Sequence, residues 1–186
     1  MEEREKRLIG EELEPGGRPK APGRLELLQR FVNTHNHDFP DDWDRIGTPE
    51  KATEWLRAKG LIGPGETVKN VARLQALREA IRALLVDPQP DAFAALARGA
   101  HLTVVVDAEG RTALAPVRRG VDGAVATLLG ILHEAQLTGH WLRMKGCRQC
   151  GYAFFDRSKN RSAAWCDMSI CGNRTKNRAY YRRRTA

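Results

Sequence analysis

Long apolar segments are absent from this sequence of 186 residues. A membrane-spanning helix needs about 18 or more consecutive apolar residues, so we expect neither a membrane protein nor a membrane partner. The N-terminus also lacks the apolar stretch of a secretory signal. Its mixed charges, prolines and glycines predict a flexible leader over residues 1–22. With no export signal, the expected compartment is the cytoplasm.

Acidic residues are scarce in one part of the chain only. From Lys145 to the end there are eleven Lys and Arg but two Asp, whereas residues 1–144 carry 20 basic and 21 acidic side chains. The net charge of +8 therefore comes from the C-terminal segment. A strongly basic surface predicts a polyanionic partner, most often nucleic acid. The alternative is a tail whose charge serves only solubility.

Hydrophobic periodicity predicts a mainly helical domain over residues 23–140. The expected helices cover residues 23–36, 48–60, 66–86, 89–100 and 123–137. Leu74, Leu77 and Ile81 repeat at three and four residues, so we expect them in the core. The β-branched run within 101–117 predicts a small antiparallel hairpin. With a small module after residue 145, the predicted fold class is α+β.

Cysteine is absent from the first 146 residues, and all four cysteines of the chain lie in the basic segment. They are Cys147, Cys150, Cys166 and Cys171, in the order C-x2-C, a gap of fifteen residues and C-x4-C. Two close pairs separated by a hairpin-sized gap are typical of a structural Zn²⁺ site. A redox pair is the weaker alternative, since it needs no second pair. We expect residues 152–155 and 163–165 to form the hairpin, followed by a helix from Gly172 onward.

The predicted last helix and the predicted turn before it contain the candidate nucleic-acid contacts. They are Arg157, Lys159 and Arg161 in the turn, and Arg174, Lys176, Asn177, Arg178, Arg182, Arg183 and Arg184 in the helix. Arginine and asparagine can pair with base edges, and arginine and lysine neutralise phosphates. We expect at least one of Tyr180 and Tyr181 to pack on the zinc module; base stacking is the alternative.

At this point the sequence resembles a known family. Residues 147–184, with the tetrapeptide Cys-Gly-Asn-Arg at 171–174, look like the CGNR zinc finger, assigned here to residues 145–186. The Phe-Val-Asn-Thr motif at 31–34 is similar to the start of the ABATE domain, assigned to 23–140. The resemblance implies zinc on the four cysteines and a bacterial transcription regulator that binds DNA. It also leaves open an RNA-binding zinc-ribbon protein.

The N-terminal domain has weaker candidates. The resemblance implies a sensory role, in which Asn33 and Thr34 would line a pocket for a small-molecule effector; dimerisation is the other role considered. The His- and Asp-rich segment 33–45 is a conceivable metal or acid–base site of an enzyme, but no second cluster completes such a site. We therefore expect no enzyme. A small-molecule-binding protein or enzyme with a secondary basic tail remains the alternative from another class.

Overall fold

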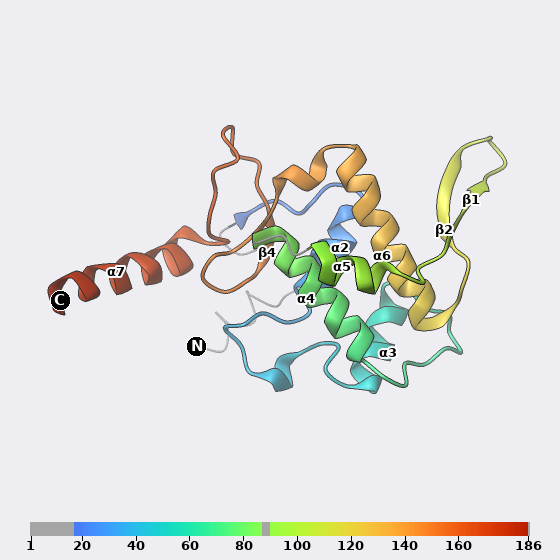
Figure 1. Ribbon diagram of the computed structural model, residues 1–186, viewed down its shortest axis with the longest axis horizontal. Helices are drawn as coiled ribbons and strands as arrows, with labels where there is room; N and C mark the ends of the chain where they lie inside the picture. The colour runs from blue at the N-terminus through green and yellow to red at the C-terminus, as the bar shows by residue number, and fades with distance from the viewer. Residues whose placement is uncertain (1–16, 87–89, 186) are drawn as a thin grey trace.

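Helices dominate the computed structural model, which describes residues 17–86 and 90–185 (Figure 1). The α-helices are α2 (Leu25–Val32), α3 (Pro49–Ala58), α4 (Ala72–Val86), α5 (Pro90–Ala97), α6 (Gly120–Leu137) and α7 (Asn173–Thr185). Strands β1 (Leu102–Val106) and β2 (Thr112–Pro116) form one antiparallel hairpin, and β3 (Met144–Gly146) and β4 (Ala153–Phe155) form another. This arrangement confirms the α+β class. Most of the predicted leader, residues 1–16, lies outside the described residues.

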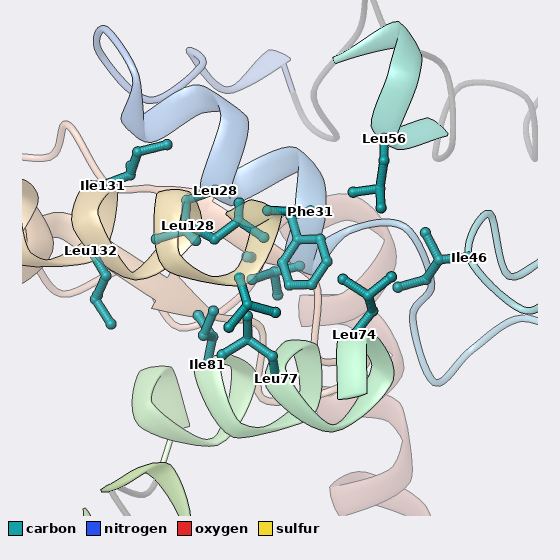
Figure 2. Close-up of a cluster of buried hydrophobic side chains, with 14 of the residues drawn as sticks. Leu28, Phe31, Ile46, Leu56, Leu74, Leu77, Ile81, Leu128, Ile131 and Leu132 are labelled. Carbon is teal, nitrogen blue, oxygen red and sulfur yellow. The ribbon is translucent and has the colours of Figure 1, made fainter. Parts of the chain in front are cut away.

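The main core lies between α2, α4 and α6 (Figure 2). Each of these helices contributes large aliphatic side chains, and α2 adds Phe31, which is fully buried. Leu74, Leu77 and Ile81 of α4 are also fully buried, which confirms the predicted helix face. The same core receives Leu56 from α3, so the helices and the loops between them form one packed body.

Shortening one of these side chains should destabilise the body strongly. We expect Leu77→Ala to lower the free energy of unfolding by about 2–5 kcal/mol, because it removes buried methyl groups and leaves a cavity. Denaturant titration of this variant beside Leu137→Ala is the measurement, since Leu137 is 75% exposed at the end of α6. Equal midpoints for both variants would contradict the assigned core.

Two helix boundaries illustrate how local hydrogen bonds set the elements. The Thr48 hydroxyl accepts from the Lys51 amide and caps α3, as the Thr-Pro-Glu sequence predicts. Helix α4 begins at Ala72 and not near residue 66, so the prediction for its start was wrong. The Asn70 side chain accepts from the Ala72 amide, and the Val68 amide donates to Thr53. Residues 66–71 therefore lie as a loop against α3.

The hairpin of the cysteine-containing module differs from the prediction. Strand β4 pairs with β3 upstream, so Met144 lies opposite Phe155; residues 163–165 form no strand. The buried Asp156 carboxylate accepts from the amides of Ser158 and Ala163, which closes the loop before a second strand can pair. Met144, Ala153 and Phe155 belong to the main core, so this hairpin joins the module to the helical body.

The two ends of the molecule are formed by elements that project from the body. Helix α7 extends from one end of the long axis, and the β1–β2 hairpin extends from the other (Figure 1). In the described part of the chain, no helix is long and apolar enough to span a membrane.

Candidate metal centre and nucleic-acid interface

The four cysteines converge on one buried point. Their Sγ atoms all lie within 4.8 Å of one another. Three edges of this cluster are 3.7 Å from Cys150 to Cys166, 3.7 Å from Cys166 to Cys171 and 3.8 Å from Cys171 to Cys150. A tetrahedral ion with metal–sulfur bonds of about 2.3 Å has edges of about 3.8 Å, whereas a disulfide needs about 2.05 Å. The cluster thus has the size of a tetrahedral metal site.

The first cysteine pair sits in the turn between β3 and β4. The Cys147 amide donates to the Tyr152 carbonyl, and the Gly151 amide donates back to the Cys147 carbonyl. Gly151 has a φ of +73°, a left-handed conformation that glycine adopts without strain. This turn places both thiols on the same side of the chain.

Cys171 of the second pair lies in a π-helical turn, Met168–Gly172, which leads directly into α7, and Cys166 lies just before this turn. The Asp167 carboxylate accepts from the amides of Ser169 and Ile170 and caps this turn. A side chain at Gly172 would place its Cβ 2.5 Å from the Met168 sulfur, so the Met168 side chain would have to shift to accommodate it. The Asn173 side chain donates to the Ser169 carbonyl. In the CGNR tetrapeptide, Gly172 and Asn173 therefore shape the turn that presents Cys171.

The electrostatics of the cluster also favour a bound cation. The neighbouring Cys147 side chain raises the pKa of the Cys150 and Cys166 thiols, and burial raises it further, whereas hydrogen bonds from the other thiols lower the pKa of Cys147. Without a cation, four thiolates packed this closely would repel one another. A divalent ion offsets that repulsion and lets all four sulfurs ionise. In the described part of the chain, no other group of three or more His, Cys, Asp or Glu side chains is close enough to hold a metal ion.

Helix α4 and the end of α2 bind the backbone of the cysteine turn. The buried Arg82 guanidinium donates to the carbonyl oxygens of Gly151 at 2.7 Å, Val32 at 2.8 Å and His35 at 2.7 Å. Asn33 forms two hydrogen bonds with the backbone of Ala153, both 2.8 Å long. These contacts fix the first cysteine pair against the helical body.

Thr34 and its neighbours belong to a second buried polar group. Arg78 donates to both carboxylate oxygens of Asp44, at 2.7 and 2.9 Å, and to the Thr34 hydroxyl. Burial alone raises the pKa of Asp44, but its hydrogen bonds from Arg78 and Ile46 outweigh this and lower the pKa overall. Burial alone would also raise the pKa of Glu79, but the guanidinium groups of Arg82 and Arg78 outweigh this and lower the pKa to about 2. Asp44 and Arg78 thus form a buried ion pair, and Glu79 extends this network to the surface.

These positions bear on the ligand-pocket hypothesis for Asn33 and Thr34. The polar atoms of both side chains already have partners within the protein. A ligand bound there would have to replace those contacts. The His- and Asp-rich segment is similarly occupied: Asp44 pairs with Arg78, His37 lies 3.3 Å from Glu79, and Asp38 pairs with Arg174.

Sequence reasoning missed several residues that hold the metal module. Arg18, in the predicted leader, donates to the carbonyls of Cys166 and Trp165 and lies over the Phe154 ring at 4.5 Å. Arg82 was missed because charged side chains are rarely buried without partners, and those partners are distant in sequence. Residues 17–22 therefore do not act as a free linker in this structure.

Helix α7 presents the predicted cationic side chains to solvent. All of the predicted contacts, in the helix and in the preceding loop, are exposed. They are Arg157, Lys159, Arg161, Arg174, Lys176, Asn177, Arg178, Arg182, Arg183 and Arg184. The Arg174 guanidinium pairs with Asp38 of the body at 2.7 Å, and the Arg178 guanidinium donates to the Gln149 side chain at 3.4 Å. Tyr180 and Tyr181 are 49% and 65% exposed, so the expectation that one packs on the zinc module was wrong. They contact each other, and the Tyr180 hydroxyl accepts from Arg184.

Comparison with known families divides the chain into the same two parts, the helical body and the cysteine-containing module. The CGNR zinc finger model matches residues 143–184. The ABATE model, described as "Putative stress-induced transcription regulator", matches residues 25–141. No curated protein matches the chain. Because the second match covers more than half of the sequence, and the finger follows it directly, the chain belongs to the ABATE family and carries a CGNR zinc finger at its C-terminal end.

Proposed function

We propose that this protein is a DNA-binding transcription regulator whose C-terminal finger is folded around one Zn²⁺. Four cysteines at tetrahedral spacing, without oxygen or nitrogen ligands, suit zinc. All four positions are filled by protein sulfur, so the ion has a structural role and no open position for catalysis. No residue of the chain is proposed as catalytic.

The observation that carries the DNA-binding proposal is the position of α7. It follows the last metal ligand, extends from the body (Figure 1) and contains basic side chains but no acidic one. The major groove of B-form DNA is about 12 Å wide and admits an α-helix. The metal turn would hold the first residues of α7 rigidly, so that Arg178 reaches base edges while the helix end contacts phosphates.

RNA binding is the second candidate within the same class. The exposed tyrosines favour it, because aromatic rings stack on unpaired bases. The major groove of an A-form RNA helix is too narrow for such readout, so the RNA reading requires single-stranded targets. A gel-shift competition with duplex DNA, hairpin RNA and single-stranded RNA separates the two readings. Preferential displacement of duplex DNA by RNA would overturn the DNA proposal.

The arginines of α7 should not be equivalent in a binding titration. Arg178→Ala should weaken binding to a selected DNA target by about 1–3 kcal/mol and relax the preference at one base position. Arg183→Ala should weaken all duplexes alike and reduce the salt slope by about one, as loss of a phosphate contact does. The target comes from selection on random duplexes, and both variants are titrated at several salt concentrations.

Arg57→Ala is the matched control, because Arg57 is an exposed arginine of α3, which belongs to neither α7 nor the β1–β2 hairpin. Binding should be unchanged in this variant. Arg174 is expected to contribute less than Arg178, since a base contact would have to displace Asp38. Equal losses on target and random duplexes for Arg178→Ala would reduce α7 to a phosphate-binding helix.

For the ABATE domain we propose dimerisation or ligand sensing. A surface cavity of about 340 Å³ between α3 and the preceding loop is lined by Trp43 and Trp55 together with Arg45, Lys51 and Glu54. It supports an effector site better than Asn33 and Thr34 do, whose polar atoms are satisfied internally. Native mass spectrometry of the purified protein would detect a retained metabolite. If the protein retains a metabolite and binds no nucleic acid, the result would favour the alternative of a small-molecule-binding protein or enzyme.

A further inference from the structure

The outer edge of β1 is an open hydrogen-bonding surface. The Val117 amide donates to the His101 carbonyl, and the Asp107 amide donates to the Arg111 carbonyl, so these two pairs are hydrogen-bonded positions. Hydrogen-bonded and non-hydrogen-bonded pairs alternate along an antiparallel ladder. Leu102, Val104 and Val106 therefore turn their backbone N–H and C=O groups away from β2.

The edge of β2 is less available than that of β1. Pro116 occupies one of its outward positions and has no N–H to donate. Helix α6 packs more closely against β2 than against β1, and it lies close to Pro116. The open edge is accordingly the β1 edge.

The side chains of this hairpin are unusual for a surface strand. Val104 and Val106 are 62% and 65% exposed on one face, and Val105 is 42% exposed on the other. No charged residue occurs within either strand. Exposed edge strands commonly carry lysine, other charges or proline that block pairing, and β1 has none of these.

We propose that β1 pairs antiparallel with β1 of a second copy across a twofold axis at Val104, giving a four-stranded sheet. In this register each outward N–H of Leu102, Val104 and Val106 meets an outward C=O of the partner. Asp107 of each copy then lies opposite His101 of the other, which places an acidic group beside a basic one. The inference deepens the dimerisation part of the proposed function and rests on it.

The charge distribution supports a second copy as the occupant. The chain carries a net charge of +8, concentrated in the C-terminal segment, and α7 lies at the end of the long axis opposite the hairpin (Figure 1). Two copies joined through β1 meet at their uncharged strands, while their basic helices stay far apart.

Cysteine crosslinking tests the register. In the variant Val104→Cys the two new side chains face each other across the axis, with Cα atoms about 5.5 Å apart, within the range of a disulfide. The matched control is Val106→Cys, equally exposed but displaced from its own copy by about 14 Å along the strand. Mild oxidation of the metal-loaded full chain should give a covalent dimer with the first variant and little with the second. Equal crosslinking of both, or none with either, overturns the proposal.

Sedimentation equilibrium tests the edge without added thiols. The wild-type chain should be a dimer, and Val104→Pro, which removes one outward N–H, should dissociate at least about tenfold more readily. Thr112→Pro removes an outward N–H from β2 and should leave the dimer intact. A monomeric wild-type chain, or an unchanged dimer in Val104→Pro, overturns the proposal. Neither assay contains nucleic acid, so their failure leaves the proposed role of α7 standing.

Discussion

Removing the metal is expected to unfold residues 147–172 and to release α7 from its fixed position. The four thiols are buried around one point, and metal binding at such sites contributes on the order of 10 kcal/mol of apparent folding energy. The helical body should stay folded, because Leu28, Leu74 and Leu77 pack without help from the cysteine turns. It should nevertheless lose stability, since Met144, Ala153 and Phe155 pack into the same core from the adjoining hairpin.

The measurement is amide hydrogen exchange, with protection determined separately for each segment of the chain. Chelation should abolish protection in residues 147–172 and lower it moderately in α2 and α4, and readdition of Zn²⁺ should restore both. Cys166→Ser supplies the same lesion without a chelator. A body that loses protection together with the finger, at the same chelator concentration, would show that the two parts form one cooperative unit. Unchanged protection in residues 147–172 would remove the metal from the folding of this module.

Replacing Arg82 should have the second-largest effect. We expect Arg82→Met to lower the free energy of unfolding by about 3–5 kcal/mol. The substitution leaves the carbonyls of Val32, His35 and Gly151 without their donor inside the protein. Glu79 keeps Arg78 as a partner, so the loss falls mainly on these backbone groups. As Gly151 follows Cys150, one of the proposed metal ligands, release of the metal to a chelator should also become faster.

The control is Arg24→Met, which removes a solvent-exposed ion pair with Glu134. An exposed pair contributes about 0–1 kcal/mol, so this variant should unfold close to wild type and release metal at the wild-type rate. Denaturant titration and a chelator-competition assay, performed on both variants, give the two readouts. Similar small losses in both would mean that water replaces the arginine at the junction.

Elements that depend on nearby residues were well predicted from the sequence. The cysteine pairs at 147–150 and 166–171, the capped helix α3 and the buried face of α4 all follow from spacings of a few residues. The same holds for the β1–β2 hairpin, whose turn and β-branched run are adjacent. In each case the physical cause lies in the local pattern itself, in helix periodicity or in the geometry of a tight turn.

Only the tertiary structure decided which distant groups meet. Residues 153–155 pair with β3 and not with 163–165, because Asp156 closes the following loop. Asn33 binds Ala153 from 120 positions away, and Arg174 pairs with Asp38. A residue's polarity and spacing indicate which face it occupies, but not which carbonyl or carboxylate lies opposite. Packing brings those partners together, and the loss of water at the junction makes each hydrogen bond there necessary. The sequence by itself therefore determined the four-cysteine cluster and most helices, while the three-dimensional fold alone determined how the finger is attached to the body.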